Sequence, residues 1–445
     1  MLLKMNTIYA ILPLAFATAV TALTKHPLVM IVSFDAFRPD YINPKTTPHL
    51  AMFKKSGVSV PYMKSVFPTK TFVNHFSIAT GLYAETHGIL DNYMFDSKFK
   101  YMHCSEEQFH YNNRVVPLWL ENEFNGDERY SGVMMWPGSE FSYLGKKPTY
   151  IGQYNKSLKW TERVDKMMTW IKNDKRPSNL IFAYFEEPDF LGHYYGIHTG
   201  EMKEQIVRVD AAVKYLTDSI KKEGLESILN LIILSDHGME SVKYKDLIYL
   251  ENYLDTTKFT NISSGTNVFI HPNPNTYDEV YKNLTALAKK LGNFNVYTRK
   301  NMLERWHVSK NERWNELIYL LAAPGYAFKD KWILEYFDGR NLSTAEIGVH
   351  GYDNLEPSMF ATFMARGPAF KSNYSIEPFE NINIFPLVSY ILNIKQTGDH
   401  VRTNGSLNNV ENLLAKNHGT SMLFYNNILL VAVTALVHIV RVKHC

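Results

Sequence analysis

Short, continuous apolar runs recur along this chain of 445 residues, and each ends at a polar or turn-forming segment. A run that lacks polar alternation is typical of a strand buried on both faces, as in a parallel sheet. The first run, 28–34, ends at Asp35. Four further runs share the pattern: 132–136, 180–185, 229–234 and 359–365. The chain is therefore expected to build its core around a parallel sheet.

Helical patterns lie between these runs. Residues 202–221 place apolar side chains at helical spacing on one face, namely Ile206, Val209, Val213, Leu216 and Ile220. Strands that alternate with helices predict an α/β fold with a doubly wound, mostly parallel sheet flanked by helices. The stretch 243–345 is less regular, so we interpret it as a subdomain inserted into a main domain that spans 23–398.

Both ends of the chain resemble targeting segments. Residues 1–22 combine the basic Lys4 with an apolar run, which is typical of a cleaved secretory signal peptide. Residues 422–440 are almost wholly apolar and precede the basic stretch 441–445, which predicts a transmembrane helix with a cytoplasmic tail. The polar stretch 399–421 would be a stalk. The prediction is a single-pass, type I protein of the cell membrane with an extracellular body.

Other features agree with a secreted body or leave alternatives open. The small residues 419–421 also suit a lipid-anchor signal. There are only two cysteines, so Cys104 is not expected to belong to a disulfide framework. The net charge of +3 gives no sign of the basic face that nucleic-acid binding needs. Six sequons could carry N-glycans: Asn155, Asn261, Asn283, Asn341, Asn373 and Asn404.

A polar segment at 68–75, with Thr71 at its centre, is expected to be the centre of the chemistry. Four segments elsewhere carry acidic or histidine residues that could meet it: Asp35, Asp189 with His193, Asp236 with His237, and His350. In a doubly wound sheet, ligands bind beyond the carboxyl ends of the strands. Three of the four segments follow a predicted strand, so we expect them to lie close together.

The spacing of these residues suits metal ligands. Asp189 and His193 are four residues apart, so on one helical turn they can share a cation. Taken alone, this pair is as well explained by a solvated helix face, and His350 by a loop histidine. Taken together, the carboxylates and imidazoles suit zinc. We therefore interpret Thr71 as a nucleophile held on two metal ions.

The chain resembles the ectonucleotide pyrophosphatase/phosphodiesterases, a family of the alkaline-phosphatase superfamily. The motifs that carry the resemblance are PTKTFVNH (68–75), TGLY (80–83), HGI (87–89), DN (91–92), WPG (136–138), EEPD (186–189), SDHGM (235–239) and HGYDN (350–354). They occur in the family's order between residues 26 and 393. The chain is most similar to the short, membrane-anchored members, the fourth and fifth human types, and the resemblance implies an alkaline-phosphatase-like core.

The resemblance also implies the roles of particular residues. Two zinc ions are implied, one bound by Asp189, His193 and His350, and the other by Asp35, Asp236, His237 and the Thr71 oxygen. Thr71 would attack phosphorus, and Asn92 would donate a hydrogen bond to a phosphoryl oxygen. Phe72 and Tyr154 would sandwich a nucleobase. Glu140 and Val73 differ from residues common in the family at those positions.

Three functions remain open from the sequence. The first is an ectoenzyme that hydrolyses extracellular nucleotides, such as NAD, dinucleoside polyphosphates, ADP or ATP, to nucleoside 5′-monophosphates. The second is a phosphodiesterase of choline phosphoesters or lysophospholipids, because an aromatic pair can also enclose choline. The third is a catalytically silent ectodomain for adhesion or signalling, against which the complete ligand set argues. A sulfatase is disfavoured, because those enzymes use a modified cysteine or serine where this chain has Thr71.

Overall fold

The computed structural model of the chain describes residues 23–96 and 100–415. The predicted signal peptide, transmembrane helix and cytoplasmic tail lie outside these residues. Within them, no helix has both the length and the apolar character needed to cross a membrane.

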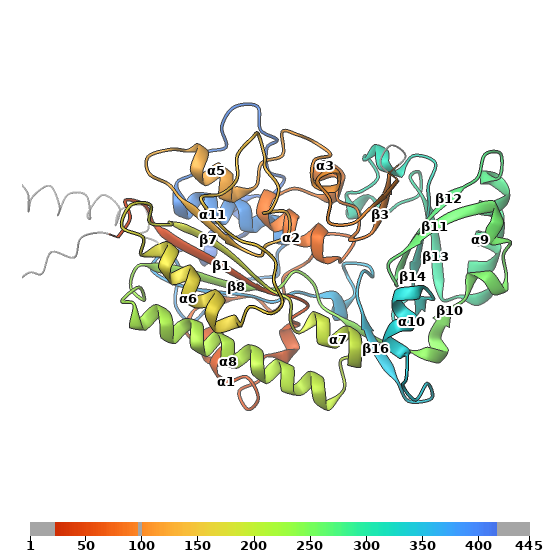
Figure 1. Cartoon of the computed structure of the whole chain (residues 1–445), viewed down its shortest axis with the longest axis horizontal. Helices are drawn as coiled ribbons and strands as arrows, with labels where there is room; N and C mark the ends of the chain where they lie inside the picture. The colour runs from red at the N-terminus through yellow and green to blue at the C-terminus, as the bar shows by residue number, and fades with distance from the viewer. Residues whose placement is uncertain (1–22, 97–99, 416–445) are drawn as a thin grey trace, which may run out of the picture.

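An eight-stranded sheet forms the centre of the body, with the strand order β18-β2-β17-β8-β1-β7-β5-β6 (Figure 1). The central strand β1 (Leu28–Phe34) is parallel to both β7 (Leu180–Phe185) and β8 (Leu229–Leu234). Every residue of these three strands is buried, which explains why their sequences do not alternate between apolar and polar. The other strands are β2 (Val58–Ser59), β5 (Ser131–Met134), β6 (Tyr150–Gly152), β17 (Phe363–Arg366) and β18 (Tyr374–Ser375).

One strand differs from the predicted parallel arrangement. The apolar run 359–365 becomes a 3-10 turn at Pro357–Met359 and then β17, which is antiparallel to both β8 and β2. The chain reaches β17 from the inserted segment without a crossover helix of the kind that joins parallel strands. The sheet is therefore mixed but mostly parallel, and the predicted α/β class is confirmed.

Helices cover both faces of the sheet (Figure 1). One face carries α1 (Pro48–Ser56), α6 (Trp160–Ile171) and α8 (Gly200–Lys222), and the other carries α2 (Thr71–Thr80), α5 (Leu118–Phe124) and α11 (Ile384–Leu392). The predicted apolar face of α8 is buried at all five positions, from Ile206 to Ile220. The body is thus a three-layer structure with its core on both sides of the sheet.

The inserted segment has a small sheet and a hydrophobic core of its own. Its antiparallel strands are β11 (Phe259–Ser263), β12 (Asn267–Pro272), β13 (Phe294–Thr298) and β14 (Ile318–Ala322), and α9 (Tyr277–Leu291) packs against β13. The chain leaves the body through β9 (Glu240–Lys243) and returns through β16 (Glu346–Val349), which pairs with β9. This pairing brings His350, just after β16, back beside Asp236 and His237, just before β9.

The chain after residue 398 packs on the body as far as it is described. Val410 and Leu413 are fully buried, and the Ala415 N–H donates to the carbonyl oxygen of Ala369 at 2.9 Å. The Thr403 hydroxyl donates to the carbonyl oxygen of Gly81, just after α2, at 2.9 Å. Residues 399–415 therefore belong to the globular body, although the sequence places them in a stalk.

Candidate active site

Three carboxylates stand beyond the carboxyl ends of neighbouring parallel strands. Asp35 follows β1 directly, and Asp236 follows β8 after one serine. Asp189 comes after β7 and begins the short helix α7 (Asp189–Tyr195). Because β8, β1 and β7 are adjacent and parallel, these three side chains meet at one edge of the sheet, where such folds bind ligands.

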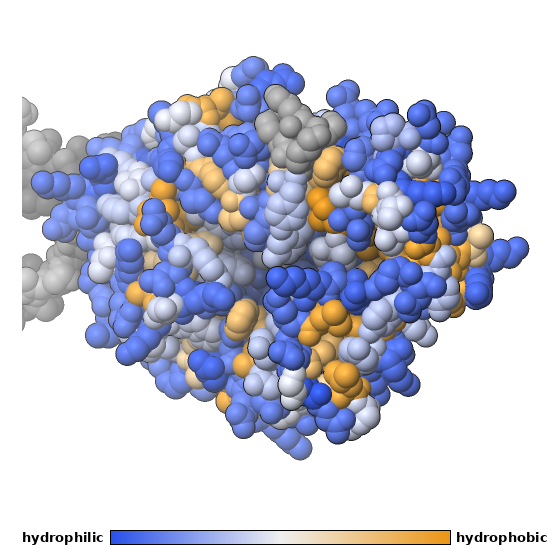
Figure 2. Space-filling model, turned by 45° about the vertical axis from the view of Figure 1, so that its right-hand side comes forward, coloured by the Kyte–Doolittle hydropathy of each residue, from blue (hydrophilic) through white to orange (hydrophobic). Residues whose placement is uncertain are grey.

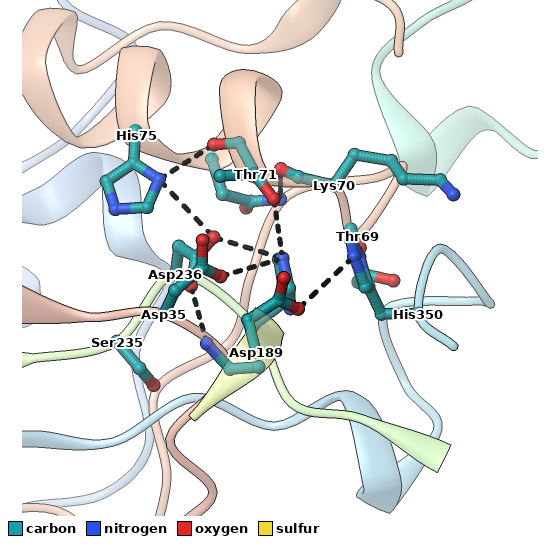
Figure 3. A network of polar contacts seen from close by, with 12 residues as sticks. Asp35, Thr69, Lys70, Thr71, His75, Asp189, Ser235, Asp236 and His350 are labelled. Carbon is teal, nitrogen blue, oxygen red and sulfur yellow. Dashed lines mark hydrogen bonds and ion pairs between the residues drawn. The ribbon is translucent and has the colours of Figure 1, made fainter. Parts of the chain in front are cut away.

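Thr71 is the first residue of α2 and points toward this edge (Figure 3). Lys70, at the N-cap position, makes no side-chain cap, and the cap comes from another segment: the Phe72 N–H donates to Oδ1 of Asn92 at 2.8 Å. The helix ends at Gly81, whose φ of 68° is the left-handed conformation that suits glycine. The amino-terminal end of a buried helix carries partial positive charge, so it favours an anion beside Thr71.

One half of the cluster surrounds the Thr71 hydroxyl. The Nε2 atom of His237 lies 3.4 Å from Oδ1 of Asp35 and 3.0 Å from Oδ2 of Asp236. The same nitrogen lies 3.3 Å from Oγ1 of Thr71. All four side chains are buried, so these polar atoms face one another away from bulk water.

The other half of the cluster is built around Asp189. Its Oδ2 lies 3.2 Å from Nε2 of His193, and its Oδ1 lies 3.5 Å from Nε2 of His350. The rings of His350 and His237 are stacked with centroids 3.8 Å apart, which joins the two halves. The seven residues predicted as metal ligands therefore lie in one continuous cluster.

The three histidines of the cluster are held in the same tautomer. Each Nδ1–H donates to a backbone carbonyl oxygen: His193 to Gly348 at 2.7 Å, His237 to Gly238 at 2.8 Å, and His350 to Thr69 at 2.9 Å. Each Nε2 thus faces the carboxylates, where it could bind a metal. A carbonyl behind a histidine is the usual support for an imidazole that binds a metal.

Among the described side chains, one oxygen of each of the three carboxylates has no hydrogen-bond donor and faces imidazole nitrogens. Oδ1 of Asp35, Oδ1 of Asp189 and Oδ2 of Asp236 are buried, and within the described residues none has a hydrogen-bond partner. Burial, together with the charges of Asp236 and Asp189, raises the pKa of Asp35 well above its usual value. A divalent cation would offset this repulsion and accept these oxygens as ligands, so the residues present fit zinc.

The pKa shifts of His350 and Asp236 also suit a metal site. Burial, with His237 and Lys70 nearby, lowers the pKa of His350 well below its usual value, so its imidazole is neutral and able to bind a metal. Burial alone would raise the pKa of Asp236, but His237 and His75 hold it well below its usual range.

Two groups of three residues have ligand atoms within 4.8 Å of one another: Asp35, Asp236 and His237, and Asp189, His237 and His350. The first group matches one predicted set apart from Thr71. The second contains His237 in place of the predicted His193. His193 joins the cluster through its contact with Asp189. His237 lies between the two groups, within reach of both.

The predicted substrate-binding residues flank the cluster without touching each other. Among the described contacts, no ring contact joins Phe72 to Tyr154; Phe72 stacks on His103, and Tyr154 is 55% exposed. Burial, with Glu186 and Asp35 nearby, raises the pKa of Tyr154 to about 12. A flat base needs a space between two rings, so this separation is compatible with the predicted sandwich.

A cavity of about 350 Å³ opens beside His193 and His350, between the body and the inserted segment. Its wall includes Asn92 and Lys70 from the body and Trp332 from the inserted segment. Figure 2 shows a mostly hydrophilic surface with separate apolar patches and a hollow near the centre of the view. The cavity beside the cluster is lined by charged and polar side chains, among them Lys70, Asn92 and Asp330.

Several supporting residues were not assigned a role from the sequence. His75 lies with Nδ1 2.8 Å from the Thr71 carbonyl oxygen and 3.3 Å from Oδ2 of Asp236, and the Tyr184 hydroxyl donates to Oδ2 of Asp35 at 2.7 Å. The spacing of His75 four residues after Thr71 on a helix was a usable signal. For Tyr184 the sequence held only a weak signal, namely a single hydroxyl in the otherwise apolar strand β7.

Comparisons with known proteins agree with this geometry. Residues 29–353 match the family described as type I phosphodiesterase / nucleotide pyrophosphatase. Human ectonucleotide pyrophosphatase/phosphodiesterase family member 5 is 36% identical over 390 residues, which cover 87% of this chain and 78% of the relative. Human bis(5′-adenosyl)-triphosphatase ENPP4 is 35% identical over 372 residues, which cover 83% of this chain and 79% of the relative.

Solved structures of the murine member 5 superimpose with a TM-score of 0.77 at 35% identity, covering 87% of this chain and 100% of the other. One of them is an inactive threonine-to-alanine variant in complex with AMP. The match over most of the chain, in both sequence and structure, shows that this protein belongs to the type I phosphodiesterase / nucleotide pyrophosphatase family.

Proposed function

We propose that the protein hydrolyses phosphodiester or pyrophosphate bonds of extracellular nucleotides, such as NAD, dinucleoside polyphosphates, ADP or ATP, and releases nucleoside 5′-monophosphates. The observation that carries the proposal is the convergence of three unpartnered carboxylate oxygens and three histidine Nε2 atoms on the Thr71 end of α2. Two relatives support a nucleotide substrate: one is named for cleaving bis(5′-adenosyl) triphosphate, and the other binds AMP.

The cluster suits two zinc ions, one held by Asp35, Asp236, His237 and the Thr71 oxygen, and the other by Asp189, His193 and His350. When bound, they would supply the positive charge that lowers the pKa of a hydroxyl nucleophile and offsets charge on the phosphoryl group. The carbonyl-tethered histidines hold their Nε2 atoms in place for this task.

Thr71 is the nucleophile in this proposal. Its hydroxyl gives its proton to solvent, Oγ1 forms a bond to phosphorus, and the leaving group departs with the electrons of its broken P–O bond and takes up a proton from solvent where its basicity requires one. Water then cleaves the Thr71 phosphoester and restores the hydroxyl. Asn92 is fixed by accepting from the Phe72 N–H, so its amide NH₂ is the donor for a phosphoryl oxygen. The inactive threonine-to-alanine variant of the murine relative supports a threonine in this role.

Product analysis tests the proposal. The purified protein is incubated with NAD, diadenosine triphosphate, ADP and lysophosphatidylcholine, with and without a chelator. We expect AMP from the nucleotides and loss of turnover with chelator. Phosphocholine as the main product would assign the protein to lipid substrates instead. Bound metal without turnover of any of the four compounds would favour a silent ectodomain.

The stereochemistry at phosphorus gives an independent test. Attack by Thr71 and attack by water each invert the configuration, so two steps give net retention. We expect a nucleoside phosphorothioate diester of one configuration, cleaved in isotopically labelled water, to give product with retained configuration. Net inversion would exclude a covalent Thr71 intermediate.

A further inference from the structure

His103 lies 11 residues after Asn92 in the sequence, and its side chain contacts two residues of the proposed site, Asn92 and Phe72. Its Nδ1–H donates to the carbonyl oxygen of Asn92 at 3.0 Å. Its ring stacks on Phe72 with centroids 5.5 Å apart and an angle of 21° between the planes. Since the Phe72 N–H donates to the Asn92 side chain, Phe72, Asn92 and His103 form a closed loop of contacts.

Phe72 needs such support because of its place on α2. All other residues of the helix are buried, whereas Phe72 is only partly buried. A phenyl ring at the surface keeps rotational freedom unless neighbouring rings restrict it, and binding a base then has an entropic cost. His103 is itself held by Tyr93, on which it stacks at 4.1 Å with 7° between the planes.

From these contacts we infer that His103 is a positioning residue for substrates that carry a nucleobase. It holds the Phe72 ring in the orientation that a base stacks on, and it does not touch the reacting atoms. Its hydrogen bond to Asn92 is partly duplicated, because Gln108 Nε2 donates to the same carbonyl oxygen at 3.2 Å. The stacked ring contact, in contrast, is the distinctive contribution of His103, since the other ring described against Phe72, that of Phe109, is tilted by 52°. This inference rests on the proposed nucleotide activity and deepens it.

Two substitutions separate the ring from the hydrogen bond. His103→Phe keeps a ring and loses the donor, while His103→Asn keeps a donor and loses the ring. The substrates are the p-nitrophenyl ester of thymidine 5′-monophosphate, which has a base, and methyl p-nitrophenyl phosphate, which has none. For the thymidine ester, we expect KM to rise about 3- to 10-fold in His103→Asn and to stay within about twofold in His103→Phe. For the methyl ester, we expect KM and kcat to stay within about twofold in both variants.

His110→Ala is the control, since His110 also combines hydrogen bonds to backbone carbonyl oxygens with ring contacts, for example to the Ser142 carbonyl oxygen at 2.9 Å and to Tyr143 at 4.9 Å, but among the described contacts does not touch Phe72. The His110→Ala variant should have an unchanged KM for both substrates. Two results would overturn the inference. One is an equal loss of kcat/KM on both substrates in the His103 variants, and the other is a KM for the thymidine ester that is unchanged in His103→Asn but raised in His103→Phe.

The affinity for AMP, measured by titration calorimetry, separates this inference from the proposed activity. If the unaltered protein cleaves neither ester but binds AMP, the proposed activity fails and the inference is judged by binding. AMP affinity should then be weaker in His103→Asn and nearly unchanged in His103→Phe. Equal affinities in all variants, or no AMP binding by the unaltered protein, would overturn the inference.

Discussion

The Oγ1 atom of Thr71 lies 3.3 Å from the Nε2 atom of His237, at the point where the first turn of α2 meets the end of β8. If this hydroxyl is the nucleophile, Thr71→Ala should lower kcat/KM by about 1,000-fold or more, and Thr71→Ser should keep part of the activity. The unfolding temperature should change little, because only a small polar group is removed. Thr80→Ala, at a buried hydroxyl of the same helix, is the control and should affect stability without comparable loss of activity.

Asp35 offers a test in which stability and metal binding change in opposite directions. Its buried carboxylate repels Asp236 and Asp189, so Asp35→Asn should raise the unfolding temperature of the chelator-treated protein by about 2–4 °C. An asparagine can still accept from the Tyr184 hydroxyl. The same substitution should lower the metal content measured by mass spectrometry.

Calorimetry with and without chelator makes the comparison. Asp174→Asn, at an exposed position, should leave both quantities unchanged. A metal-free Asp35→Asn protein that is less stable than the unaltered one would show that the carboxylate contributes to the fold and not to a cation site.

Glu187 makes the stability depend on pH. Burial raises its pKa from 4.5 to about 7, so between these values the folded state holds a proton that the unfolded state has lost. Below about pH 4.5 the Glu187 carboxyl is protonated in both states and, as far as this group is concerned, the protein has its full stability. As the pH rises from 4.5 to 7, the free energy of unfolding falls by up to about 3 kcal/mol. Glu187→Gln should remove this dependence and be more stable than the unaltered protein at pH 8.

Urea unfolding of the chelator-treated protein at pH 5, 6, 7 and 8 measures the effect of Glu187, since the charge of Asp189 contributes to its raised pKa. Glu204→Gln, at an exposed position on α8, should preserve the pH dependence of the unaltered protein. Parallel pH profiles for the unaltered and Glu187→Gln proteins would contradict the raised pKa.

Gly351 tests how tightly the loop of His350 is packed. A Cβ at this position would lie 2.3 Å from Oδ1 of Asn267 and 2.4 Å from Cε of Lys70, and the φ of 116° also disfavours other residues. Gly351→Ala should therefore lower the free energy of unfolding by about 2 kcal/mol or more and displace His350, with a fall in activity.

Gly339→Ala is the control for Gly351. Gly339 also has a positive φ, of 68°, but an added Cβ would meet no atom within 4 Å. Gly339→Ala should lower the free energy of unfolding by only about 1 kcal/mol, through backbone strain, and should keep full activity. Equal losses in the two variants would mean that backbone strain, and not the contact with Asn267 and Lys70, decides the effect.

The sequence was most informative where one local pattern determines both burial and position. The bounds of β1, β7 and β8 could be predicted to the residue, because a run buried on both faces is mostly apolar and ends where the chain becomes polar. The meeting of Asp35, Asp189 and Asp236 followed from the geometry of parallel strands. The individual ligand sets depended on the family resemblance.

The features that could not be predicted depend on contacts between distant segments. The reversed direction of β17 follows from where the inserted segment returns, which no local pattern encodes. The Tyr184 hydroxyl supports Asp35 from a strand whose other side chains are apolar, so its partner is visible only after the strands pair. The packing of residues 399–415 likewise depends on a surface formed by residues far earlier in the chain.

The pairing of β9 with β16 has a consequence for how the protein is made. During synthesis, Asp35 and Thr71 emerge early, but His350 emerges only after the whole inserted segment has been translated. Until that segment has folded and β16 has docked on β9, a nascent chain holds only part of the cluster. Under the proposed function, the complete ion site can thus form only after residue 350 has been translated, and a chain truncated before this residue cannot form it.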